Sequence, residues 1–139
     1  MANDISITVT QRHGRTCASS GSKWEPILGY SRAVRSGNLI AVTGTVGISA
    51  DGTYSKSLAE QTRRALAIIQ AAIESLGGKL SYVIRTRIFV TDVSKWQEVA
   101  EVHGQLFSDI RPAISIVQVP RLIDDEAQIE IEADAVVAD

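Results

Sequence analysis

The sequence predicts an α+β fold in which two helices pack on one face of a mixed β-sheet, in the order ββαβαββ. Two segments, 57–76 and 94–108, carry apolar residues at helical spacing, and shorter apolar segments of strand length precede, separate and follow them. No linker, internal repeat or low-complexity stretch divides the 139 residues. We therefore expect a single domain that spans residues 1–139.

The N-terminal part of the chain predicts strands and a long loop. Residues 4–10 predict a strand, whereas residues 18–29 are rich in Ser, Gly and Pro and predict a loop. Two apolar segments, 31–35 and 39–44, flank the turn signal Ser36-Gly37-Asn38. This arrangement predicts a β-hairpin.

The first helix has clear start and stop signals. Ser57 and Glu60 form a capping-box pair, because a serine side chain and a glutamate three residues later satisfy each other's backbone amides. Gly77-Gly78 supplies the stop. We expect the helix to span Ser57–Leu76. The remaining strands are predicted at 83–90, 114–119 and 127–137.

The second helix is predicted at Ser94–Ser108, with Ser94 and Gln97 as another capping-box pair. Its predicted core stripe consists of Trp96, Val99, His103, Leu106 and Phe107. The opposite face of the sheet has no predicted helix. Several strand residues are too apolar for both faces to contact water: Ile40, Val42, Ile88, Ile116 and Val117. We expect other subunits to cover the second face.

Composition and charge exclude several classes of function. The net charge of -2 argues against binding to nucleic acid or to an anionic membrane, and no apolar stretch approaches the length of a membrane span. The single Cys17 and the two histidines, His13 and His103, argue against a disulfide framework and a metal site. The chain also lacks the common phosphate, dinucleotide and hydrolase motifs. We expect a cytoplasmic protein without a cofactor or metal, in which Cys17 and His103 are structural.

The segment QIEIEAD at 128–134 carries the clearest candidate chemistry. Glu130, Glu132 and Asp134 alternate with apolar residues, so a strand places three carboxylates on one face. Two interpretations remain open: a solvated acidic face, or a general base at Glu130 or Glu132 with its pKa raised by burial. Hydroxyl groups that would orient a water molecule belong to Tyr30, Ser31, Thr43 and Ser115. Arg85 and Arg87 share a strand face and are expected to pair with these carboxylates or to bind an anion.

Several segments together resemble the RidA/YjgF family of imine and enamine deaminases, formerly grouped as L-PSP endoribonuclease-like proteins. The resemblance covers roughly residues 26–137 in one unbroken order. It rests on the stretches GYSRAV at 29–34, GNLI at 37–40, EQTR at 60–63, RTRIFVTD at 85–92, RPA at 111–113, VQV at 117–119 and IEIEA at 129–133.

The resemblance implies a chorismate-mutase-like fold, a homotrimer and small-molecule pockets between subunits. It implies that Glu130 handles a water molecule as the catalytic residue. It also implies that Tyr30 lines the substrate pocket. The substrate-binding residues that we expect are Tyr30, Thr43, Gly44, Ile114, Ser115 and Arg87. Family deaminases have an arginine after the Pro-Ala pair, which binds the substrate carboxylate, and this chain has Ile114 there.

The replacement by Ile114 argues against the usual 2-imino-acid deaminase activity. The leading hypothesis is hydrolysis of an enamine, an imine or a related metabolite in a cleft between subunits. The alternatives are a non-catalytic trimer that binds a metabolite or partner and, less favoured, a ribonuclease. The sequence leaves two questions open: whether Arg87 or Arg111 replaces the missing arginine, and whether residues 10–25 cover the cleft.

Overall fold

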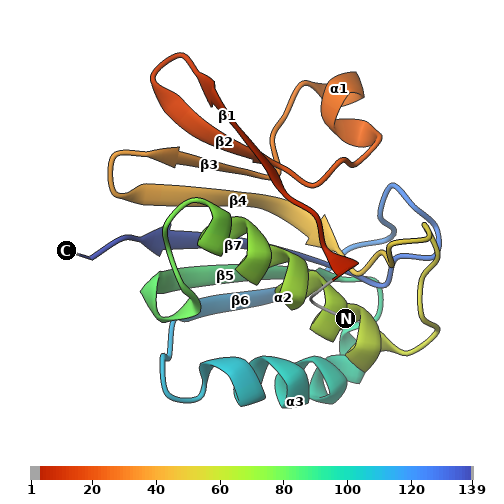
Figure 1. The fold of residues 1–139 in the computed structure, drawn as a ribbon. Helices are drawn as coiled ribbons and strands as arrows, with labels where there is room; N and C mark the ends of the chain where they lie inside the picture. The colour runs from red at the N-terminus through yellow and green to blue at the C-terminus, as the bar shows by residue number, and fades with distance from the viewer. Residues whose placement is uncertain (1–3, 139) are drawn as a thin grey trace.

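The computed structural model describes residues 4–138. Its seven strands form one sheet in the order β1-β2-β3-β4-β7-β5-β6, and two long helices, α2 and α3, lie on one face of that sheet (Figure 1). All neighbouring strands are antiparallel except β5 and β6, which are parallel. The strands are β1 Thr8–Arg12, β2 Arg15–Ser19, β3 Ala33–Ser36, β4 Leu39–Val46, β5 Val83–Val90, β6 Ala113–Gln118 and β7 Ile129–Val136.

The strand β7 lies between β4 and β5 and directs different side chains to the two faces of the sheet. Ile129, Ile131, Ala133 and Ala135 are buried beneath the helices. Because side chains alternate along a strand, the three acidic residues between them point to the opposite face, where they are partly exposed. The predicted alternation of this segment is therefore confirmed.

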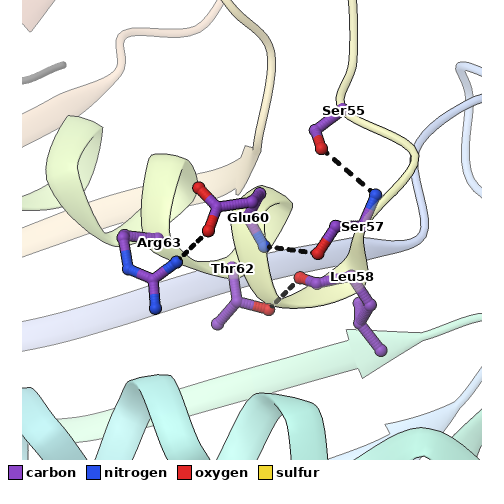
Figure 2. A network of polar contacts seen from close by, with 6 residues as sticks. All are labelled: Ser55, Ser57, Leu58, Glu60, Thr62 and Arg63. Carbon is purple, nitrogen blue, oxygen red and sulfur yellow. Dashed lines mark hydrogen bonds and ion pairs between the residues drawn. The ribbon is translucent and has the colours of Figure 1, made fainter.

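The helix α2 (Leu58–Ser75) begins where its capping signals predict. The Ser57 hydroxyl accepts a hydrogen bond from the backbone N–H of Glu60, with Oγ 3.2 Å from N, as Figure 2 shows. The Thr62 hydroxyl donates to the Leu58 carbonyl at 2.8 Å, and Arg63 forms an ion pair with Glu60 on the exposed side. These contacts satisfy polar groups of the first turn, while the apolar stripe of the helix packs on the sheet.

The helix α3 (Trp96–Phe107) begins two residues later than predicted, and the predicted capping box at Ser94 is wrong. Its N-cap, Lys95, makes no side-chain capping bond. The Asp92 carboxylate instead accepts hydrogen bonds from the Ser94 N–H and hydroxyl and caps the short 3₁₀ helix η3 (Val93–Lys95). The predicted core stripe is also corrected at two positions: Trp96 is 50% exposed and Leu106 is 37% exposed, whereas Val102 is buried.

The predicted loop at 18–29 is corrected by two elements. Strand β2 extends to Ser19, and the short helix α1 (Trp24–Leu28) follows it. The predicted strand at 4–10 lies further along, at β1, which forms a hairpin with β2 at one edge of the sheet. A second short 3₁₀ helix, η2 (Leu80–Tyr82), precedes β5.

The uncovered face is less apolar than the sequence pattern suggests. Ile40, Val42 and Ile88 are at most 4% exposed and lie under the helices, so they do not require a second covering layer. Val117, in contrast, lies on the helix-free face and is 45% exposed. Among residues 4–138, no helix is long and apolar enough to span a membrane. The α+β architecture with two helices on one sheet face is as expected, but four strands precede α2 where the predicted order ββαβαββ has two.

Candidate functional site

A pocket of about 920 Å³ opens at the end of β4, between the segment before β3 and the loops that follow β4 and β6. It brings together four of the predicted site residues: Tyr30, Thr43, Gly44 and Glu130. A β-bulge forms its floor. The register places Val42 opposite Ala133 and Thr45 opposite Ile131, so Thr43 and Gly44 together oppose one residue of β7.

Gly44 makes room for the Glu130 carboxylate. A Cβ atom at position 44 would lie 2.6 Å from Oε2 and 2.8 Å from Cδ of Glu130, which is closer than any ordinary contact. The glutamate side chain therefore occupies the place that a side chain at position 44 would need. Thr43 helps to fix the bulge, because its hydroxyl donates to the Ser31 carbonyl at 2.7 Å.

The Glu130 carboxyl is half-buried and electrostatically perturbed. Burial raises its pKa above the usual range, the positive charge of Arg32 lowers it, and the negative charge of Glu132 raises it again. The net direction is upward. A carboxyl group whose pKa lies closer to neutrality is a better proton acceptor when ionised and a better donor when protonated.

Arg32 is a pocket residue to which the sequence assigns no role. It is 6% exposed, and four of its hydrogen bonds go to uncharged protein acceptors. Its Nε donates to Ser20 Oγ at 3.0 Å, and its Nη1 donates to the Gly44 carbonyl at 2.9 Å and to Thr45 Oγ1 at 3.2 Å. Its Nη2 donates to the Tyr30 hydroxyl at 3.2 Å. No local pattern reveals this role, because most of these partners lie 12 or 13 residues away.

The serine-rich loop before α1 is ordered by Glu25. Oε2 of this buried carboxylate accepts hydrogen bonds from the N–H and hydroxyl of Ser20 and from the N–H of Ser22, at 3.0–3.2 Å. Burial raises the pKa of Glu25, but hydrogen bonds from Ser19, Ser20 and Ser22 outweigh burial and lower it. The loop therefore presents Ser20 to Arg32 and forms one wall of the pocket. Residues 20–24 thus line this pocket.

The opposite wall comes from the loops after β4 and β6, which lie side by side in Figure 1. The Tyr54 hydroxyl donates to Asp124 at 2.6 Å, and burial together with this carboxylate raises the pKa of Tyr54. The buried Gln61 amide joins both loops: it donates to the Ser55 and Glu126 carbonyls and accepts from the Gln128 N–H, at 2.8–2.9 Å.

The N-terminal segment adds a further wall. Asp4, Ile5 and Ser6 line the pocket, and an ion pair joins Asp4 to Arg64 on α2. Arg64 also donates through Nε to the Ile48 carbonyl at 2.9 Å. This segment lies well before the residues that carry the family resemblance.

The remaining predicted site residues lie outside the lining of this pocket. Ile114 and Ser115 belong to the edge strand β6, where Ile114 is 46% exposed. Arg87 pairs with Glu132 at 3.0 Å and with Asp134 at 3.4 Å, as expected for a charge partner of the acidic face. Arg111 donates to the Ser108 carbonyl at 3.0 Å. Neither arginine lines the pocket within the described chain.

The two residues expected to be structural are buried. His103 forms a 3.0 Å hydrogen bond with the Thr86 hydroxyl and packs on Phe107, and burial lowers its pKa. Cys17 is 4% exposed. Within residues 4–138, no group of three or more His, Cys, Asp or Glu side chains is arranged to bind a metal ion.

Comparison with known proteins places these features in one family. The Endoribonuclease L-PSP family model matches residues 20–137. The chain is similar to a Mycobacterium tuberculosis member of the YjgF/YER057c/UK114 family, with 50% identity and a TM-score of 0.83 over 88% of this chain and 99% of that one.

Two relatives from Escherichia coli are more distant. A 2-iminobutanoate/2-iminopropanoate deaminase is 32% identical over 111 residues, which is 77% of this chain and 86% of that protein. The structure of TdcF with bound serine is 28% identical, with a TM-score of 0.74 over 78% of this chain and 88% of that one.

Proposed function

This chain belongs to the RidA/YjgF family, and from that premise we propose that it hydrolyses a small imine or enamine in the pocket around Glu130. One observation carries the proposal: a half-buried carboxyl with a raised pKa lies against Gly44 in a pocket that also contains the Tyr30 hydroxyl. A similar protein is named for the deamination of 2-iminobutanoate and 2-iminopropanoate.

The proposed reaction needs a base, a water molecule and a hydrogen-bond donor. The ionised Glu130 carboxylate removes a proton from water as the water oxygen bonds to the C=N carbon, and the C=N electron pair moves to nitrogen. Glu130 then returns the proton to that nitrogen, which gives a carbinolamine. The carboxylate next takes the proton of the new hydroxyl group and transfers it to nitrogen as the C–N bond breaks, so a carbonyl forms and ammonia leaves. The Tyr30 hydroxyl is suited to donate a hydrogen bond to the substrate nitrogen.

We further propose that the chain acts as a homotrimer, with the edge strand β6 of a neighbouring subunit completing the cleft. Val117 is 45% exposed on the helix-free face of β6, and Ile114 is 46% exposed on the opposite face of the same edge strand; both exposures support burial of this strand by another copy. An isoleucine cannot bind a carboxylate, so the expected substrate does not depend on an arginine-held carboxylate. Turnover of 2-imino acids should therefore be slow.

The decisive experiment measures ammonia release from freshly generated imines, with and without a carboxylate, by the wild type and by Glu130→Gln. We expect Glu130→Gln to lower turnover by about 10²–10⁴-fold, the usual contribution of a general base. Equal turnover by both proteins would refute the role of Glu130. Light scattering tests the trimer, and a particle of the 15.0 kDa monomer mass would refute the shared cleft.

A second candidate function is ligand binding without turnover. The absence of the family arginine at position 114 favours it, and the relative TdcF was crystallised with bound serine. Thermal-shift screening separates the two functions, because a ligand that binds only the folded state raises Tm whether or not it reacts. A large shift without ammonia release would favour the binding protein.

A further inference from the structure

The Arg32 guanidinium is an unusual buried cation. It is 6% exposed, and no carboxylate of the described residues forms an ion pair with it. A buried charge is costly unless hydrogen bonds and nearby opposite charge compensate for it. Four neutral acceptors supply the hydrogen bonds, and the charge of Glu130 is close enough to act on Arg32 through space.

The bond between Arg32 and Tyr30 has a direction. Because a guanidinium can only donate, the Tyr30 oxygen must accept. The Tyr30 hydroxyl proton is then available for another acceptor, and no side chain or carbonyl of residues 4–138 takes it. Since Tyr30 lines the pocket, its O–H is oriented to donate to a ligand. The guanidinium also lies over the Tyr30 ring, with Cζ 5.5 Å from the centroid, which restricts the ring.

Arg32 and Glu130 meet at Gly44. Arg32 binds the Gly44 carbonyl, and the Glu130 carboxylate fills the place of the missing side chain. The neighbouring strands add no titratable group at this point, because Gly44 and Val46 on β4 and Phe89 on β5 are uncharged. Glu132 on β7 adds a negative charge, and Tyr54, Asp124 and Glu126 line the far wall of the pocket. Arg32 is thus the cation that acts on the Glu130 carboxyl.

We propose that Arg32 is a positioning residue that fixes the Tyr30 hydroxyl as a donor to the ligand and keeps Glu130 ionised as the proton acceptor. This inference rests on the proposed function for its chemistry. Four hydrogen bonds of the guanidinium go to protein acceptors, so Arg32 does not bind a ligand carboxylate in a bidentate manner. The ligand should instead present a hydrogen-bond acceptor, such as an imine nitrogen, to Tyr30 and a water molecule to Glu130.

The test is a ¹³C NMR titration of the Glu130 carboxyl in the ligand-free protein. Arg32→Gln removes the charge that favours the ionised form, so the titration midpoint of Glu130 should move upward. Arg32→Lys retains a charge and should move it less. Arg35→Gln is the matched control, because Arg35 lies three residues away in β3 but binds the Leu76 and Gly37 carbonyls. An unchanged midpoint in Arg32→Gln would overturn the electrostatic part of the inference.

Kinetics test the orientation of Tyr30. Arg32→Lys and Tyr30→Phe should each lower kcat for a neutral imine by about 10-fold or more, because both remove a directed donor. The acidic limb of the kcat profile should move to higher pH in Arg32→Gln, and less in Arg32→Lys. Wild-type kcat in Arg32→Lys would overturn the orienting role, and this comparison remains decisive even if Arg32→Gln does not fold. Absence of turnover in the wild type would refute the proposed function, whereas the NMR titration still decides the effect of Arg32 on Glu130.

Discussion

Replacing Gly44 by alanine tests the geometry of the pocket directly. The new Cβ would lie 2.6 Å from Oε2 of Glu130, so the carboxylate must retreat by about 0.8 Å to reach the 3.4 Å of an ordinary contact. A displacement of this size in a reacting group costs about 10²-fold in rate. The side chain that must move is flexible at its end, and alanine restricts the unfolded chain, so the free energy of unfolding should change by less than about 1 kcal/mol.

Two glycines serve as matched controls. At Gly47, a Cβ would meet the backbone of α2, with the Gln61 Cα at 2.6 Å, and backbone cannot retreat as a side-chain end can. Gly47→Ala should therefore lower the free energy of unfolding by about 3 kcal/mol. At Gly104 in α3, no heavy atom lies within 4 Å of the added Cβ, so Gly104→Ala should stabilise the protein by about 0.5–1 kcal/mol.

The measurements are urea unfolding and turnover of a neutral imine. The expected pattern is a stable, slow Gly44→Ala variant, an unstable Gly47→Ala variant, and a stable Gly104→Ala variant with wild-type turnover. Full turnover by Gly44→Ala would refute the claim that Glu130 reacts from its place against Gly44. A large loss of stability in Gly44→Ala would show instead that the bulge itself cannot accept a side chain.

Three further predictions concern stability. Glu130→Gln should raise the free energy of unfolding at pH 7 in urea titrations, because the folded state raises the pKa of Glu130 and so disfavours the ionised carboxylate. The free energy of unfolding of the wild type should therefore fall, relative to that of Glu130→Gln, as the pH rises from about 4.5. A difference between the two proteins that does not change with pH would contradict this prediction. Burial lowers the pKa of His103, so the wild type should lose stability as the pH falls below about 6.5. His103→Gln should remove this acid-induced loss, because the glutamine amide can still form a hydrogen bond with Thr86. Calorimetry at several pH values checks this. Gln61→Ala should cost about 2–4 kcal/mol in urea unfolding, from three lost hydrogen bonds of about 1 kcal/mol each, and a neutral effect would mean that water replaces the amide.

Local signals predicted the regular elements well where the contacts that stabilise them are also local. Strand β5 spans residues 83–90, as its apolar pattern predicts, and α2 begins at its capping serine. The start of α3 differs from the prediction because residues 93–95 form a 3₁₀ helix capped by Asp92, so Ser94 lies inside this helix and Lys95 takes the N-cap position of α3. The five-residue α1 is too short to show a helical period and depends on the hydrogen bonds of Glu25.

In the candidate site, too, the residues with a local sequence signal are predictable and those that depend on distant contacts are not. The sequence singles out Glu130, because its strand alternates and resembles the closing strand of a known family. Arg32 lies in the family-like stretch GYSRAV but receives no role from it, because its contacts depend on Ser20, Gly44 and Thr45, which only the folded sheet brings to it. A single arginine beside an apolar strand gives no sequence signal for burial. The placement of Ile114 beside a pocket depends on a second subunit and so remains a prediction.

The contacts of the cationic side chains in the pocket decide whether one of them can replace the arginine that family deaminases have where this chain has Ile114. Arg32 donates hydrogen bonds to four protein acceptors, and Arg64 donates to the Ile48 carbonyl and forms an ion pair with Asp4. The Lys23 ammonium lies 5.1 Å from the centre of the Trp24 ring. Within residues 4–138, the pocket therefore offers a ligand carboxylate no guanidinium fork to replace the family arginine. Such a ligand would also meet the Glu130 carboxylate at the reacting centre, and the repulsion would oppose binding. A neutral imine avoids both costs, which is why we expect carboxylate-free substrates to react faster.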